Sequence, residues 1–305
     1  MKRRTFIETS LATAAIVAAP RAIFGAMSGA MSGAIPGMPH HIQPIGLQLY
    51  TVRNLMKTDF DGTIAGVAKV GYKEVEFAGY DGKTPKEVRA VLDQNGLTAP
   101  SAHIPYEEIE NKWPQTLEAA HVVGHKYLVC PWFEVNQRTA DGYKKAVELF
   151  NKAGEASQKA GIQFAYHNHG FEFEKTDGLG DTLPFDYFLT KTDPKLVKFE
   201  MDLCWITVAG QDPVAYFNKY PGRFPLVHVK DWSKEGTANP EYKVAVGHAV
   251  ANGHLANVGE GSIDFKRIFE HSSKAGIKHY FVENDEAKGL DDIRVSYNYL
   301  SKLEA

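Results

Sequence analysis

Histidines and carboxylates recur along the chain in short clusters, each at the end of an apolar, β-forming run. These clusters are His103, Tyr166-His-Asn-His169, Glu200-Met-Asp202, His228-Val-Lys-Asp231 and Glu283-Asn-Asp285. Residues two apart on a strand point to the same side, so His167 and His169 share one face. Burying such groups is costly unless they are paired or bind a metal. Imidazole and carboxylate groups are suitable ligands for Mn, Zn, Fe, Co or Mg. The pattern therefore favours one divalent metal ion over a purely hydrogen-bonded polar layer.

Eight β-rich runs alternate with amphipathic stretches and place these clusters at strand ends. The predicted strands cover residues 45–50, 74–77, 99–103, 126–130, 163–167, 197–202, 226–230 and 279–283. Helical patterns between them include residues 85–95, 140–160 and 263–275. Eight such units predict a single-domain (β/α)8 TIM barrel over residues 44–305. The alternative, an open doubly wound sheet, normally carries a glycine-rich turn after its first strand, and Leu49-Tyr-Thr-Val-Arg53 has no glycine.

The composition fits a globular protein and excludes several classes. The 305 residues are 44% hydrophobic and 23% charged, with a formal net charge of −3. A nucleic-acid partner is not expected, because the chain has no basic stripe. The two cysteines, Cys130 and Cys204, are too few for a cysteine zinc site. Both lie in apolar strand-like runs, so we expect two free, buried thiols, with a disulfide as the alternative.

The N-terminus has the features of an export signal. Met-Lys-Arg-Arg-Thr-Phe-Ile-Glu precedes an apolar, alanine-rich stretch from Leu11 to Pro20, and small residues follow. The pair Arg3-Arg4 followed by Phe6 resembles a twin-arginine signal. The apolar stretch is shorter than the ~20 residues that span a bilayer, so no stable membrane insertion is expected. Residues 1–34 are therefore interpreted as a signal peptide with a small-residue linker, and the location as periplasmic.

Several motifs, in order along the chain after Pro44, resemble those of the sugar isomerase/epimerase (xylose isomerase-like) superfamily. They are Ser101-Ala-His-Ile-Pro-Tyr106, Tyr166-His-Asn-His-Gly-Phe-Glu172, Glu200-Met-Asp-Leu-Cys-Trp205, Val227-His-Val-Lys-Asp231, Val258-Gly-Glu-Gly-Ser-Ile-Asp264 and Phe281-Val-Glu283. The resemblance implies one divalent metal on ligands from strands five to eight. By position these are His167, Asp202, His228 and Glu283. Many members have a glutamate at the first position, so His169 and Glu172 remain alternatives there. A histidine ligand favours softer transition metals over Mg.

The resemblance also implies proton removal next to a carbonyl, with an enediolate stabilised by the metal as a Lewis acid. The expected catalytic residues include three candidate bases and one cation for developing negative charge: Glu283, His169, Glu172 and Lys230. The expected substrate-binding residues are His103, Trp205, Tyr106 and Glu260. Glu260 lies in the Gly259-Glu-Gly261 segment, whose glycines fit either close approach to a ligand or a tight turn. Residues 233–261 form a long segment after the seventh strand and are expected to act as a lid or binding loop.

Three functions follow from this interpretation, all with a small carbohydrate as partner. The first is a metal-dependent sugar isomerase or epimerase. The second is a lyase or dehydratase that acts on a keto-sugar or 3-keto-glycoside, like inosose dehydratases, through the same intermediate. The third is a non-catalytic periplasmic sugar-binding protein, for which an aromatic-rich cleft without a metal would be expected.

The export signal yields the first testable prediction. Replacing Arg3 and Arg4 by lysine should leave the precursor in the cytosol, because the twin-arginine route reads the arginine pair rather than its charge. Cell fractionation and immunoblotting measure the distribution. A double variant that reaches the periplasm as efficiently as the native protein would contradict the twin-arginine interpretation.

Overall fold

The computed structural model describes residues 42–236, 242, 245 and 252–305. No helix within these residues is long and apolar enough to cross a membrane. The predicted signal, residues 1–34, lies outside the described residues, so export stays a prediction.

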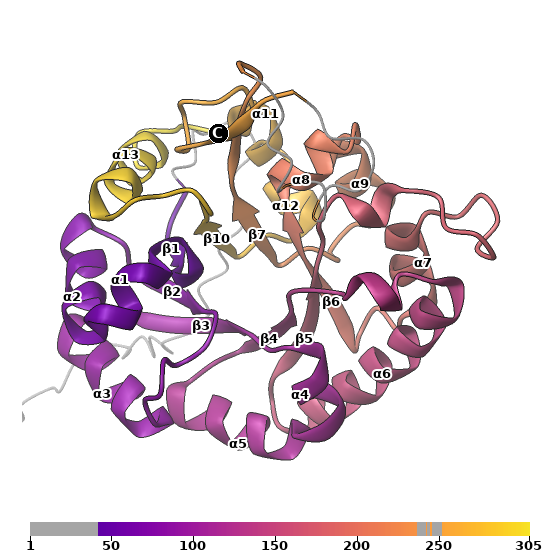
Figure 1. Ribbon diagram of the computed structural model, residues 1–305, viewed down its shortest axis with the longest axis horizontal. Helices are drawn as coiled ribbons and strands as arrows, with labels where there is room; N and C mark the ends of the chain where they lie inside the picture. Colours follow the sequence, from indigo (N-terminus) through magenta and orange to yellow (C-terminus); the bar gives the residue numbers. More distant parts are fainter. Residues whose placement is uncertain (1–41, 237–241, 243–244, 246–251) are drawn as a thin grey trace, which may run out of the picture. The chain divides into compact units, whose positions relative to one another are not determined.

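Eight parallel strands close into a barrel, with the helices outside the ring of strands (Figure 1). Around the barrel the order is β1-β10-β7-β6-β5-β4-β3-β2, and β1 pairs with both β2 and β10. The strands are β1 Ile45–Gln48, β2 Glu74–Phe77, β3 Thr98–His103, β4 Tyr127–Cys130, β5 Gln163–His167, β6 Val197–Asp202, β7 Leu226–Val229 and β10 His279–Val282. The structure confirms the predicted TIM barrel.

The helices follow the amphipathic stretches. They are α1 Arg53–Thr58, α2 Phe60–Val70, α3 Pro85–Asn95, α4 Tyr106–Asn111, α5 Trp113–Val123, α6 Ala140–Lys159, α7 Pro184–Lys191, α8 Leu203–Val208, α9 Pro213–Lys219, α11 Phe265–Phe269, α12 Ser272–Ala275 and α13 Leu290–Leu300; the 3-10 turns are η1 Leu49–Val52, η2 Val135–Gln137 and η3 Phe171–Phe173. Helix α3 shows the local rules clearly. Thr84 and Glu87 form a capping box, and Gly96 ends the helix in the left-handed conformation.

One expectation is corrected. The helix expected over residues 263–275 is two short helices, α11 and α12, because the backbone of His271 leaves the helical conformation and caps the start of α12. The long segment after β7, residues 233–261, is described only in part, so its expected role as a lid or binding loop stays a prediction. Its described ends pair as an antiparallel two-stranded sheet of β8 Asp231–Ser233 and β9 His254–Ala256.

The inside of the barrel has an apolar floor. Tyr127, Val129, Ala165, Leu226 and Phe281 form a cluster separate from the larger core between strands and helices. At Gly46 a Cβ atom would lie 2.5 Å from the Phe281 ring, so glycine is needed for the ring to fill this space. Cys130 and Cys204 are both buried and unpaired, as expected. The polar side chains lie above this floor.

His125 fixes β3 from the outside of the barrel. Its Nδ1 donates to the Ala99 carbonyl at 2.7 Å, and its Nε2 accepts from the Tyr80 hydroxyl at 2.8 Å. A carbonyl can only accept, so the ring is neutral with its proton on Nδ1. Burial lowers the pKa of His125 to about 4.

The buried His125 predicts a loss of stability in acid. As pH falls below the unfolded pKa of about 6.5, the unfolded chain binds a proton that the folded chain refuses. The contribution of His125 is thus complete above about pH 6.5 and lost as pH falls through 4, a change of about 3 kcal/mol. Urea unfolding of native protein and a His125→Gln variant at several pH values measures it.

The exposed His121 of α5 provides the control, because a His121→Gln change removes a histidine from the surface. The gap in unfolding free energy between native and His125→Gln protein should narrow toward pH 4, whereas the gap to His121→Gln should stay near zero. A His125→Gln gap that is constant with pH would contradict the assignment.

Candidate functional site

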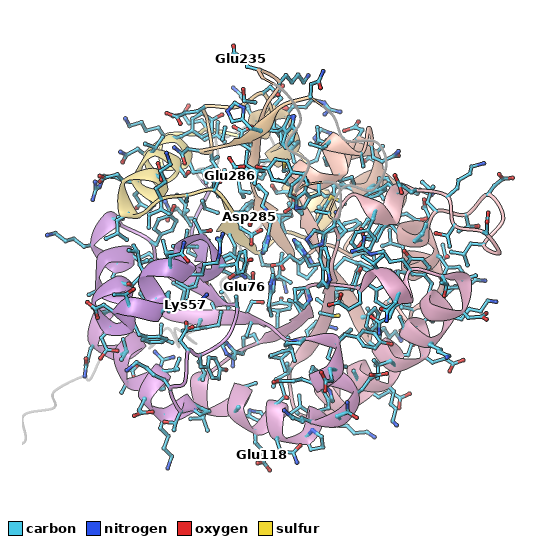
Figure 2. All side chains as sticks on the ribbon, viewed as in Figure 1. Lys57, Glu76, Glu118, Glu235, Asp285 and Glu286 are labelled. Atoms are coloured by element: carbon cyan, nitrogen blue, oxygen red, sulfur yellow. The ribbon has the colours of Figure 1, made fainter. Side chains whose placement is uncertain are left out.

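Charged and polar side chains gather inside the carboxyl-terminal end of the barrel. Figure 2 shows one of them, Glu76, within the ring of strands. The group is at most 9% exposed and comprises Glu76, His103, His167, Glu200, Asp202, His228, Lys230 and Glu283. Each stands at or just before the end of its strand or directly after it. Active sites of TIM barrels are built at this end.

Four of these side chains form what we call the mouth site: His167, Asp202, His228 and Glu283. One ligand atom from each lies within 4.8 Å of the other three. His228 Nδ1 is 2.8 Å from a Glu283 oxygen, and His167 Nε2 is 3.6 Å from Asp202 Oδ2. Among the described residues, neither His167 Nε2 nor Asp202 Oδ2 has a hydrogen-bond partner, although both atoms are buried. A buried nitrogen and a buried carboxylate oxygen that both lack a hydrogen bond fit a divalent cation, which would satisfy both.

The surrounding backbone orients these two ligands. Asp202 caps α8, since its Oδ1 accepts the amides of Cys204 and Trp205 at 2.9 and 2.8 Å. Its other oxygen, Oδ2, is therefore left to face the site. His167 Nδ1 lies 3.3 Å from the Pro131 carbonyl, which can only accept. Nδ1 therefore carries a proton, and in the neutral ring Nε2 keeps the lone pair that a metal needs.

Lys230 supplies a buried positive charge beside the mouth site. Its Nζ is 2.8 Å from Glu283, 3.0 Å from Asp285 and 3.5 Å from Asp202. The ammonium also lies 4.9 Å from the centre of the Trp205 ring, within cation–π range. Burial works against the charge, yet the carboxylates, Asp285 first, raise the pKa of Lys230 well above its usual range. Burial likewise opposes ionisation of Glu283, but Lys230 and then His228 hold its pKa well below the usual range.

A second layer of polar side chains lies deeper in the barrel, where Glu200 precedes Asp202 by two residues on β6. It contacts the other ring nitrogen of His228, Nε2. His228 Nε2 is 2.8 Å from Glu76 and 3.2 Å from Glu200, and His103 Nε2 is 3.2 and 2.9 Å from the same two carboxylates. Glu76 also accepts from Gln48 and Ser101. Sequence reasoning gave Glu76 no role. The one available signal was its spacing of two from Glu74, which places both glutamates on the same face of β2.

His169 and Glu172 occupy different places around the β5 end. The His169 ring centre lies 4.9 Å from that of His167 and 4.7 Å from that of Trp132. Burial, and then His167, hold the pKa of His169 well below its usual range, so the ring is neutral. Glu172 accepts from the Tyr166 hydroxyl at 2.6 Å and from the His169 amide at 2.9 Å, and burial raises its pKa to about 7. Glu172 thus holds the backbone that carries His169.

The structure separates the residues expected to bind substrate. His103 lies in the deeper layer, and Trp205 is 1% exposed beside Lys230. Tyr106 is half-buried and packs on Phe133 and Phe150, away from the mouth site, as part of the core. Glu260 lies at the rim, in a shallow pocket that also contains Asn257 and Asn284.

The Gly259-Glu-Gly261 segment is a tight turn around Asp231. The amides of Gly259 and Gly261 donate to Asp231 Oδ2 at 2.9 and 3.0 Å. A Cβ atom at Gly261 would lie 2.2 Å from the same carboxylate. The glycines therefore allow the backbone to wrap Asp231, which orients this loop beside the site.

Comparison with known proteins agrees with this architecture. The family model described as "Xylose isomerase-like TIM barrel" matches residues 64–299. An inosose dehydratase of Lacticaseibacillus casei is 27% identical over 274 residues, covering 81% of this chain and 90% of that protein. A sugar phosphate isomerase/epimerase from Parabacteroides distasonis superposes with a TM-score of 0.68 at 27% identity, covering 90% of this chain and 97% of that one. The IolI protein, solved with a zinc atom, shares the fold at 11% identity and a TM-score of 0.65, over 85% of this chain and 98% of that one.

The buried Lys230 predicts a large and metal-sensitive stability effect. In chelator-treated protein, Lys230→Met should lower the free energy of unfolding by about 3–5 kcal/mol, because it leaves buried carboxylates without their cation. Added Zn²⁺ should reduce this loss, since an ion at the mouth site would replace the missing charge. Urea unfolding with and without Zn²⁺ measures both effects.

The matched control is Lys219→Met, which breaks a surface pair with Asp186. Its cost should be no more than about 1 kcal/mol, with or without Zn²⁺. Equal losses for the two lysines would show that the Lys230 pairing does not stabilise the fold.

Proposed function

This chain belongs to the xylose isomerase-like TIM barrel family, and from that premise we propose that it is a divalent-metal-dependent sugar isomerase or epimerase. It moves a proton next to the carbonyl of a carbohydrate-like substrate through an enediolate. The observation that carries the proposal is the mouth site, where a buried nitrogen of His167 and a buried oxygen of Asp202 lack partners among the described residues. The IolI protein, which has the same fold, was solved with a zinc atom, in keeping with a metal-dependent function.

The mouth-site residues would hold the ion, which supplies Lewis-acid stabilisation of negative charge on the substrate oxygen. Each other step belongs to the chain itself. Lys230, kept protonated by its carboxylate neighbours, places a second positive charge beside that oxygen. His169 is neutral and lies next to His167, so its ring is in a state to accept the proton from carbon. Glu172 positions His169 by holding its amide, and Glu283 stays ionised as a ligand.

A dehydratase or lyase is the second candidate function. The observation that favours it is the similarity to the inosose dehydratase of Lacticaseibacillus casei along 90% of that protein's length. Elimination uses the same proton removal and then needs a donor for the departing oxygen. Lys230 is a protonated group in the right region, so the site suits either outcome.

Export to the periplasm is also proposed and rests on the sequence of residues 1–34 alone. A periplasmic location suits an enzyme that acts on carbohydrates taken up from outside. The arginine-to-lysine experiment described above tests it independently of the enzyme's chemistry.

The proposed chemistry is tested by hydrogen exchange. Chelator-treated protein, reloaded with Mn²⁺, Zn²⁺ or Co²⁺, is incubated in D2O with keto-sugars, inososes or 3-keto-glycosides, and the products are identified by NMR. Isomerisation or epimerisation should place deuterium on the carbon next to the carbonyl, whereas elimination should release a new unsaturated product. Asp202→Asn should slow turnover by about 100-fold to 1000-fold, the equivalent of losing several kcal/mol of Lewis-acid stabilisation.

Asp212→Asn is the control, because Asp212 caps the outer helix α9 away from the barrel interior. It should bind metal and turn over as the native protein does. Sugar binding by metal-free protein without any exchange would indicate a binding protein. Failure of all metal-loaded samples to exchange any substrate class would overturn the proposed function.

A further inference from the structure

The deeper polar layer has a regular geometry of its own. We call the four atoms that meet there the inner ring: Nε2 of His103, Nε2 of His228 and one oxygen each of Glu76 and Glu200. The two nitrogens and two oxygens alternate, and the four edges measure 2.8, 3.2, 2.9 and 3.2 Å. These atoms lie within 4.8 Å of one another. Neighbouring ligand atoms of a tetrahedral Zn²⁺ site lie about 3.3 Å apart when each is about 2.0–2.1 Å from the ion, so the four edges are close to the spacing that such a site needs.

The inner ring has two more nitrogen–oxygen contacts than hydrogen bonds. His228 Nε2 bonds to Glu76 at 2.8 Å and His103 Nε2 bonds to Glu200 at 2.9 Å. Each Nε2 carries at most one proton, so the two 3.2 Å contacts have none. In addition, the second oxygen of Glu200, Oε1, is buried and has no partner among the described residues. The carboxylates of Glu76 and Glu200 are 0% exposed, so bulk water does not reach them. Both observations fit a cation bound among these four atoms.

We propose that the inner ring is a second binding site for a divalent transition-metal ion, separate from the mouth site and one layer deeper in the barrel. Two imidazoles and two carboxylates suit Zn²⁺ or Co²⁺ and neutralise its charge. An ion that binds there replaces the two Nε2 protons, which pass to solvent, so the charge of the ring is unchanged. His103, at 9% exposure, gives the ring its contact with solvent.

The two sites share His228, which determines how the ions would communicate. His228 Nδ1 faces Glu283 in the mouth site, and its Nε2 faces Glu76 in the inner ring. When both sites are filled, both ring protons of His228 leave to solvent and the imidazolate bridges the two ions. Such a bridge couples the electron spins of two paramagnetic ions.

Metal counting tests the proposal. Chelator-treated chain is titrated with Zn²⁺, desalted and analysed for zinc per chain by mass spectrometry. Native protein should hold two ions, and Glu76→Gln, His103→Asn and Asp202→Asn one each. The control is Glu74→Gln, which removes the other buried glutamate of β2, paired with His279 at the opposite end of the strand, and should still hold two. Circular dichroism establishes that each variant is folded, and His103→Asn serves if Glu76→Gln does not fold.

Electron paramagnetic resonance with Cu²⁺ tests the bridge. Native protein with two Cu²⁺ should give much less signal than two isolated ions, and Glu76→Gln with one Cu²⁺ should give the full signal of one. One zinc in the native protein, kept by Glu76→Gln and lost by Asp202→Asn, would overturn the second site and leave the proposed function intact. Zinc lost by Glu76→Gln but kept by Asp202→Asn would support the inner ring and count against the mouth site.

Discussion

The arrangement of the polar side chains in this barrel depends on the free-energy cost of burying negative charge. Glu76, Glu200, Asp202 and Glu283 are at most 5% exposed, and Lys230 is the one lysine buried with them among the described residues. A lone carboxylate in such surroundings would shed its charge by taking up a proton. The pKa values of Glu76 and Glu283 instead move down, since imidazoles and Lys230 outweigh burial. The site therefore exists only because its cations are fixed in place.

His228 connects the buried carboxylates of the two layers. Its two nitrogens contact carboxylates in both layers, Glu283 above and Glu76 below. Glu283 follows β10, which is a neighbour of β7, whereas Glu76 is on β2, which is not, so the contact with Glu76 crosses the inside of the barrel. The apolar floor under the inner layer, with Phe281 packed against Gly46, keeps the charged groups at one end. Packing of the strands and electrostatics of the site thus depend on each other.

Much of this architecture is encoded locally and was predictable. Period-two alternation and apolar runs gave all eight barrel strands, with ends within two residues of those found, for example 45–50 against β1 Ile45–Gln48. The same alternation, together with the family resemblance, predicted that Asp202, His228 and Glu283 meet at one site. The structure places one ligand atom of each within 4.8 Å of the others. Sequence reasoning missed Glu76, because its spacing of two from Glu74 was the one signal in its own strand. Its partners Gln48, Ser101 and His228 come from three other strands, and only the closed barrel brings them together.

The directions of side chains outside the strands could not be predicted from the sequence either. Glu172 and Tyr106 follow strand ends in the chain, as functional residues of barrels do. The 3-10 turn η3 directs Glu172 toward Tyr166 and the His169 amide, and α4 directs Tyr106 onto Phe133. Both directions are set by turns whose geometry depends on what they pack against. A strand has a fixed alternation, whereas a loop does not.

His167 has a consequence for the chemistry of the mouth site. The family resemblance implies a glutamate at this position in many members, which would give the ligand set three negative charges and leave a site that holds a divalent ion at −1. With His167 the ligand set has two carboxylates, Asp202 and Glu283, so a site that holds such an ion would be neutral. Lys230 beside it is paired with Glu283 and Asp285. In a buried site of low effective dielectric constant, a difference of one charge within a few ångströms is worth several kcal/mol. Under the proposed function, a less negative ligand set would stabilise negative charge that develops on a substrate oxygen more strongly.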